Sequence, residues 1–178
     1  MIFGRWRLGR GFLAVALLAV ASAAAPGLAR AQEGSGCGGF RWPLDLEHAA
    51  LVRPDKPSLA NGGALALGVA TTLELQPLAS AGLPKAPERA PKSAQAFAGH
   101  FVLAAPAKPG VYKVTISSPG WIDLIDGENY LHPVAFTGAT GCEGARKSVK
   151  FDLPARPLAL QFSGVESDRI SVIVSPDQ

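Results

Sequence analysis

Residues 111–117 read VYKVTIS and residues 148–153 read SVKFDL, and apolar and polar side chains alternate in both. In the first stretch Tyr112, Val114 and Ile116 point one way, and the residues between them point the other. Alternation with a period of two predicts β-strands that bury one face and expose the other. Further stretches with this pattern lie at residues 72–76, 101–103, 121–125, 134–136, 158–163 and 170–174.

These runs, about seven or eight in all, are separated by turn-forming residues, which favours an all-β fold. We expect an antiparallel β-sandwich, with a jelly-roll-like arrangement or a small barrel as the alternatives. The side chains expected to lie between the sheets are Tyr112, Val114, Ile116, Val149, Phe151, Leu153, Leu160, Phe162, Val172 and Val174.

Two short sequences predict reversals of the chain. Residues 118–120 (SPG) predict a hairpin-like turn between the runs on either side. Asp126 and Gly127 form a pair that is common in two-residue hairpin loops. We therefore expect the run at 121–125 to pair with its neighbours along the chain.

Two other segments do not follow the strand pattern. Residues 45–52 (DLEHAALV) predict a short N-terminal helix of two turns that ends before Pro54. Residues 83–93 (LPKAPERAPKS) carry three prolines, which exclude a regular helix or an internal strand. We interpret this second segment as a long extended loop, with a polyproline recognition motif as the alternative.

The first 31 residues predict an export signal. Three arginines precede an apolar run at residues 11–25, and residues 29–31 (ARA) offer the small side chains that a signal peptidase requires. The alternative is a retained membrane anchor, but the run is shorter than a typical bilayer span. Cleavage would leave residues 32–178 as one sandwich domain, periplasmic or secreted and without a membrane span. It would comprise an extension with early strands at 32–96 and the sandwich core at 97–178.

The charge of the chain changes once the signal is set aside. Four of the 17 basic residues and none of the 14 acidic ones lie in residues 1–31, which leaves 13 basic against 14 acidic. A net charge near zero does not fit a basic nucleic-acid-binding protein. We therefore expect a protein or a small ligand as the partner, and no nucleic acid.

The chain has two cysteines, Cys37 and Cys142. An even number of cysteines in an exported protein predicts a disulfide. Two free thiols and a pair of metal ligands are the alternatives. Neither cysteine has another cysteine or a histidine at the spacing of structural zinc sites, which disfavours the metal.

Most of the chain after residue 31 resembles a family of small, mostly uncharacterised exported proteins from alphaproteobacteria. The segments that carry the resemblance are CGGFRWPLDLEHAAL, FAGHFVLAAPAKPGVYKVTIS, GWIDLIDG, FTGATGCEGARKSVKFDLP, LALQFSG and ISVIV. Some members are labelled homogentisate 1,2-dioxygenase, which implies an Fe(II)-dependent oxygenase as one possible activity. The later strands are also similar to small sandwich modules of secreted peptidases. Neither resemblance brings a catalytic motif.

The histidines are the first candidates for a metal site, because mononuclear iron oxygenases use two histidines and one carboxylate. His48, His100 and His132 are scattered, and none has a carboxylate two residues away. The candidates for such a site are His100, His132 and Glu128. Scattered surface or half-buried histidines explain the same pattern, so we expect no cofactor unless the oxygenase alternative holds.

The stretch WIDLIDGEN at 121–129 holds the candidates for ligand binding. Trp121 beside Asp123 could stack on a sugar or hold a peptide, although a tryptophan in the core is the more frequent case. Asp123, Asp126 and Glu128 beside Gly127 could bind calcium, but their spacing is not that of the calcium-binding helix-loop-helix motif, and a simple hairpin turn is the favoured interpretation. Arg146 and Lys147 could hold an anion, although solvent-exposed charge on a hairpin is the favoured interpretation.

No sequence motif for a catalytic serine, a phosphate loop or a dinucleotide site is found. We therefore interpret the chain as an exported, non-enzymatic binding module or an accessory protein of the cell envelope. The alternative is the metal-dependent oxygenase that the resemblance implies.

Overall fold

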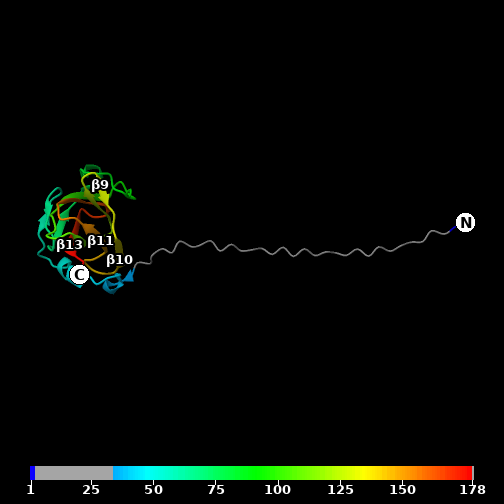
Figure 1. Cartoon of the computed structure of the whole chain (residues 1–178), viewed down its shortest axis with the longest axis horizontal. Coiled ribbons are helices and arrows are strands. Elements are labelled where there is room, and N and C mark those ends of the chain that lie inside the picture. The colour runs from blue at the N-terminus through cyan, green and yellow to red at the C-terminus, as the bar shows by residue number, and fades with distance from the viewer. Residues whose placement is uncertain (3–33, 178) are drawn as a thin grey trace. The chain divides into compact units, whose positions relative to one another are not determined.

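The computed structural model describes residues 1–2 and 34–177 (Figure 1). The predicted export signal lies almost wholly outside the described residues. By their contacts, residues 32–178 form one compact unit. Among the described residues, no helix is both long enough and apolar enough to cross a membrane.

Two β-sheets make up this unit. The first has seven strands in the order β1-β10-β11-β7-β13-β4-β2. Its strands are β1 (Gly34–Ser35), β2 (Ser58–Leu59), β4 (Thr71–Glu74), β7 (Gly110–Ile116), β10 (Ala135–Thr140), β11 (Lys147–Leu153) and β13 (Arg169–Pro176).

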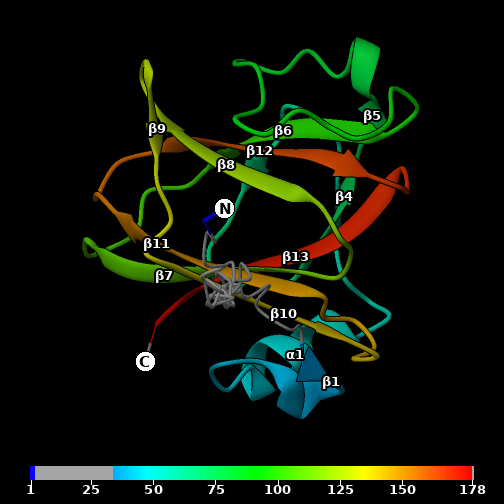
Figure 2. The same cartoon turned by 90° about the vertical axis from the view of Figure 1, so that its right-hand side faces the viewer.

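The second sheet has the order β3-β6-β12-β8-β9, and β5 also pairs with β6, which makes six strands. Its strands are β3 (Ala64–Leu65), β5 (Gln76–Pro77), β6 (Phe97–Leu103), β8 (Trp121–Asp126), β9 (Asn129–Leu131) and β12 (Leu158–Val165). The sheets lie face to face as two layers (Figure 2). The predicted β-sandwich is therefore confirmed.

The pairing directions differ in part from the prediction of an antiparallel fold. All the long strands pair antiparallel, as expected. However, β1, β2 and β3, each of two residues, pair in parallel with β10, β4 and β6. Both sheets are therefore mixed, because short pieces of the N-terminal region run along the strands of the core.

The two predicted reversals have different outcomes. Residues 118–120 do not form a hairpin, because β7 lies in the seven-stranded sheet and β8 lies in the six-stranded one. They carry the chain from one layer to the other. The pair Asp126 and Gly127 does form a hairpin: Asp126 of β8 lies opposite Asn129 of β9, and Gly127 has a φ of 59°. A positive φ favours glycine at this turn.

The predicted core is confirmed, since all ten side chains named from the alternating runs are buried. Phe101 of β6 and Phe162 of β12 form its aromatic centre, with ring centroids 6.1 Å apart. Val134 and Phe136 differ from the rest of the pattern, because they share a face but are 57% and 58% exposed. They lie beside or on β10, next to the edge of the seven-stranded sheet.

The helix α1 (Asp45–Leu51) falls within the stretch 45–52 that predicted a helix. Two short 3-10 helices, η1 (Cys37–Gly39) and η2 (Leu78–Ser80), flank the early strands. The α1 helix lies on the outer side of the seven-stranded sheet (Figure 2). There Leu51, Cys142, Ala145 and Ile173 form a second, smaller apolar cluster.

The outer faces of the sheets are less exposed than the alternating pattern predicts. Lys113, Thr115 and Ser148 occupy polar positions on the seven-stranded sheet, yet all three are buried. Gln161 and Ser163 are buried in the same way on the six-stranded sheet. Residues 37–52 cover the first face, and part of the chain between β5 and β6 lies over the second (Figure 2).

Candidate functional site

The buried polar groups on the six-stranded sheet gather around Trp121. In the ladder between β8 and β12, Trp121 lies opposite Ser163, and Asp123 lies opposite Gln161. Residues two apart on a strand share a face. All four side chains therefore lie together on the outer face, and we call this group, with Arg89 and Lys147, the Trp121 site.

A buried carboxylate is at the centre of the Trp121 site. The Trp121 Nε1–H donates to Asp123 Oδ1 at 2.6 Å, and Gln161 Nε2 donates to Asp123 Oδ2 at 2.9 Å. Asp123 is 2% exposed. These hydrogen bonds fix the orientation of the indole ring and of the amide at the same time, because both donate to one carboxylate.

Two buried polar atoms of the Trp121 site differ from the rest in their hydrogen bonding. Gln161 Oε1 and Ser163 Oγ have no hydrogen-bond partner among the described residues. His100 Nδ1 is a third such atom, and His100 lies opposite Gln161 on β6. Buried polar atoms are normally hydrogen-bonded, since leaving one unsatisfied costs about 1–3 kcal/mol. Three buried polar atoms on one sheet face without a partner among the described residues are therefore an unusual feature of this face.

Two cations lie against the indole ring of Trp121. The Lys147 Nζ lies 5.0 Å from the ring centroid, and the Arg89 guanidinium carbon lies 5.6 Å from it. Lys147 Nζ also donates to the Gly120 carbonyl at 2.9 Å. The site therefore combines an aromatic surface, a fixed carboxylate and amide, and positive charge at the rim.

Arg89 belongs to the segment 83–93, which we call the proline-rich segment. The prediction of an extended loop fits its structure, since none of its residues lies in a helix or strand. Its other attachments are polar: Lys85 Nζ donates to the Glu128 carbonyl at 2.7 Å, and the Tyr130 hydroxyl donates to the Ala86 carbonyl. Glu88 lies 3.6 Å from His132 Nδ1.

Of the six residues predicted for ligand binding, the structure brings Trp121, Asp123 and Lys147 together. Asp126 lies at the other end of β8, where Arg156 donates to both of its oxygens and lowers the pKa of its carboxyl. Glu128 lies in the turn before β9. Arg146 precedes β11, and its backbone amide donates to the Ile116 carbonyl.

The three histidines lie in different surroundings. His132 contacts Glu88, the His100 amide donates to Asn61 Oδ1 at 2.8 Å, and His48 lies beside Glu143. Within residues 34–177, two histidines and a carboxylate do not come together as a group of metal ligands. The grouping of His100, His132 and Glu128 that an iron site would need is therefore not formed by these residues.

The predicted disulfide is confirmed, because Cys37 and Cys142 are bonded. His48 of α1 lies next to it, with Nε2 3.7 Å from Cys37 Sγ. The same Nε2 is 2.8 Å from the carbonyl oxygen of Glu143, to which it can donate. Within residues 34–177, this is the one group of three metal-capable side chains whose ligand atoms lie within 4.8 Å of one another.

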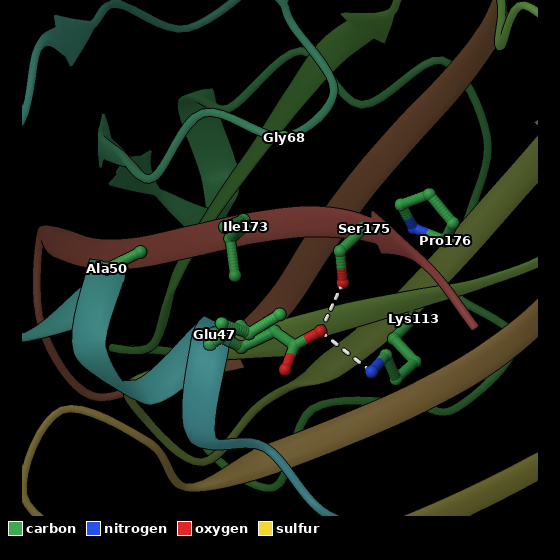
Figure 3. Close-up of a pocket in the computed structure, with 8 residues that line it drawn as sticks. Glu47, Ala50, Gly68, Lys113, Ile173, Ser175 and Pro176 are labelled. Carbon is green, nitrogen blue, oxygen red and sulfur yellow. Dashed lines mark hydrogen bonds and ion pairs between the residues drawn. The ribbon is translucent and has the colours of Figure 1, made fainter. Parts of the chain in front are cut away.

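A pocket of about 270 Å³ lies between α1 and β13 on the other sheet (Figure 3). Glu47 points into it from α1, and its Oε1 accepts from Lys113 Nζ at 2.8 Å and from the Ser175 hydroxyl at 2.5 Å. The apolar part of the lining comes from Leu46, Ala50, Ile173 and Pro176.

The ion pair of Glu47 and Lys113 is buried on both sides, with side chains 5% and 9% exposed. Burial raises the pKa of Glu47, but the hydrogen bonds from Lys113 and Ser175 outweigh it and hold the pKa below its ordinary value. The sequence analysis missed this pair. The available signal was the spacing of Leu44, Glu47 and Leu51, which places the carboxylate on the apolar face of α1.

Comparison with known proteins adds no family or relative to these observations. No family model matches the chain, and neither a curated protein nor a solved structure matches it.

Proposed function

We propose that this chain is an exported, non-enzymatic binding module that holds a carbohydrate with an anionic group at the Trp121 site. The observation that carries the proposal is a pair of buried atoms, Gln161 Oε1 and Ser163 Oγ, that have no hydrogen-bond partner within residues 34–177 and lie beside a fixed carboxylate and an indole ring. A sugar supplies hydroxyl groups that can both donate and accept hydrogen bonds. Its ring also offers an apolar face to an aromatic side chain.

The positive charge beside Trp121 indicates which class of carbohydrate the site would bind. Arg89 and Lys147 lie within cation–π distance of the Trp121 ring. A carboxylate on the bound sugar would form charge-assisted hydrogen bonds with them, which are stronger than bonds between neutral groups. We therefore propose an acidic sugar, such as a uronic acid, as the ligand class.

Access to the site requires the proline-rich segment to move. Gln161 and Ser163 are 0% and 1% exposed, and Arg89 of this segment lies against Trp121. The contacts of Lys85 and Tyr130 with backbone carbonyls are exposed, and exposed polar contacts contribute little to stability. A ligand can therefore displace the segment at a small cost in free energy and stack on the Trp121 ring in place of Arg89.

Export is the second part of the proposal. The Cys37–Cys142 disulfide supports it, since such bonds persist in oxidising compartments. Intact-mass measurement of the protein from an expressing bacterium should show a chain that begins at Gln32. A membrane-bound chain that keeps residues 1–31 would contradict this part.

The ligand class can be tested by calorimetric titration of the protein with oligouronates and with neutral oligosaccharides of equal length. We expect the oligouronate to bind more tightly, and Arg89→Ala to weaken its binding about tenfold. Arg156→Ala is the matched control, because Arg156 is also an exposed arginine near the six-stranded sheet but pairs with Asp126. Equal effects of the two variants, or binding of neither sugar, would contradict the proposal.

A further inference from the structure

The corner of the molecule around the disulfide joins three separate segments. Cys37 lies in η1, His48 in α1, and Cys142 in the turn after β10. Their two sulfur atoms and one imidazole nitrogen all lie within 4.8 Å of one another. Two thiolates and an imidazole are ligands that thiophilic divalent cations such as Zn²⁺ prefer.

The spacing of these atoms is close to that of a zinc site. With Zn–S near 2.3 Å and Zn–N near 2.0–2.1 Å, tetrahedral geometry places a sulfur and a nitrogen ligand about 3.6 Å apart. Cys37 Sγ and His48 Nε2 are already 3.7 Å apart. Two sulfur ligands of one zinc lie about 3.8 Å apart, so the main change needed is separation of the two bonded sulfurs.

Open space flanks Cys37 on both sides. Glycines precede and follow this cysteine at positions 36 and 38, and a Cβ at either would meet no atom within 4 Å. Cys37 is exposed, so a reductant in solution can reach the disulfide.

We propose that reduction of the Cys37–Cys142 disulfide by a dithiol or phosphine reductant converts this corner into a Cys₂His site for Zn²⁺. The sulfur–sulfur bond breaks as it takes up two electrons from the reductant and two protons, which gives two thiols. The cation then replaces both thiol protons and binds two thiolates.

The imidazole of His48 must change tautomer as the cation binds. Its Nε2 gives up the hydrogen bond to the Glu143 carbonyl, and the ring proton moves to Nδ1. A water molecule completes the fourth coordination position. The covalent bond and the metal are thus alternative links between the same two segments, and this proposal does not depend on the carbohydrate site.

The experiment is a titration of the purified protein with Co²⁺ under anaerobic conditions, after reduction with a phosphine. We expect one Co²⁺ per chain, with a thiolate-to-cobalt charge-transfer band and the intense visible bands of tetrahedral cobalt. Zn²⁺ should displace the cobalt, and the oxidised protein should show no such bands. His48→Ala should weaken binding at least about tenfold, whereas His132→Ala is the matched control and should not.

Thermal unfolding provides an independent readout. Zn²⁺ should raise the Tm of the reduced protein by several degrees and leave the Tm of the oxidised protein unchanged. The proposal is overturned if the reduced protein shows no charge-transfer band, or if His48→Ala binds as tightly as the unaltered chain. A reduced chain that loses its β-sheet circular dichroism and does not regain it with Zn²⁺ would also overturn it.

Discussion

Part of the chain covers the outer face of each sheet. We call residues 37–52, on the seven-stranded sheet, the first cover, and the proline-rich segment, on the six-stranded sheet, the second cover. The two covers are attached by different kinds of contact. Residues 37–52 are held by a disulfide, a buried ion pair and an apolar cluster that includes Leu51 and Ile173. The proline-rich segment is held mainly by exposed polar contacts, and it adds no residue to either apolar cluster.

The buried polar groups on the two outer faces also differ in their hydrogen bonding. Under residues 37–52, Ser148 Oγ accepts from Trp42 Nε1 and from the Thr115 hydroxyl. On the outer face of the six-stranded sheet, Ser163 Oγ and Gln161 Oε1 have no partner among the described residues. These contacts attach the first cover firmly, whereas the proposed carbohydrate site requires the second cover to move.

The largest effect should come from removing the disulfide. The bond joins residues 105 positions apart, for which the chain-entropy model gives about 4–5 kcal/mol of stabilisation. Cys37→Ala/Cys142→Ala should therefore lower the free energy of unfolding by about that amount in denaturant titrations. A loss below about 1 kcal/mol would show that the first cover does not depend on this bond.

The second effect concerns the buried ion pair under the first cover. Glu47→Ala leaves the Lys113 ammonium buried without its partner, which should cost about 3–5 kcal/mol. The double variant Glu47→Leu/Lys113→Met removes both charges and should restore most of that loss. If the double variant unfolds as readily as the single one, the cost lies in packing and not in the unpaired charge.

The pH dependence of stability gives a further test of that ion pair. The folded-state pKa of Glu47 lies below its ordinary value of 4.5, so the folded state favours the ionised carboxyl. The contribution of the pair is therefore complete above about pH 4.5 and is lost as the pH falls through the lower folded value. Glu47→Gln should reduce the slope of stability against pH below 4.5, and an unchanged slope would contradict this assignment.

Much of the sandwich could be predicted from alternation alone. Tyr112, Val114 and Phe151 are buried as expected, because a period of two places them on one face of a strand. The alternation also placed Trp121 and Asp123 on one face, where they form a hydrogen bond. The disulfide followed from the number of cysteines and the predicted export.

The covers of the outer faces could not be predicted in that way. Alternation shows that the two faces of a strand differ, but it does not show whether the polar face meets water or another part of the chain. Burial of Lys113 and of Gln161 depends on segments without strand periodicity, whose position is set by distant contacts. For the same reason, the sequence did not show that β7 and β8 belong to different sheets.

A pair of lysines allows the covers to be compared directly. Lys150 Nζ forms an ion pair with Asp177 at 2.6 Å and lies 4.5 Å from the Trp42 ring centroid. Lys85 Nζ lies 4.9 Å from the Tyr130 ring centroid and bonds to an exposed carbonyl. We expect Lys150→Ala to cost about 1–2 kcal/mol and Lys85→Ala about 0.5 kcal/mol or less, as measured by chemical denaturation.

A reversed order of these two lysine effects would show that the proline-rich segment is the more firmly attached cover. Hydrogen exchange gives an independent check, because weakly attached segments open more often. The backbone amides of Lys85, Ala86 and residues 88–90 should exchange faster than those of residues 46–52.

The most direct test of the proposed carbohydrate site compares two buried serines, Ser148 and Ser163, which are 0% and 1% exposed. Ser148→Ala removes a partnered hydroxyl and should lower the free energy of unfolding by about 1–2 kcal/mol without changing oligouronate affinity. Ser163→Ala removes a hydroxyl that has no partner among the residues the structure describes, so it should leave stability unchanged or slightly raised while it weakens oligouronate binding severalfold. If Ser163→Ala destabilises the fold as Ser148→Ala does and leaves sugar binding unchanged, the hydroxyl is structural and the Trp121 site is not the binding surface.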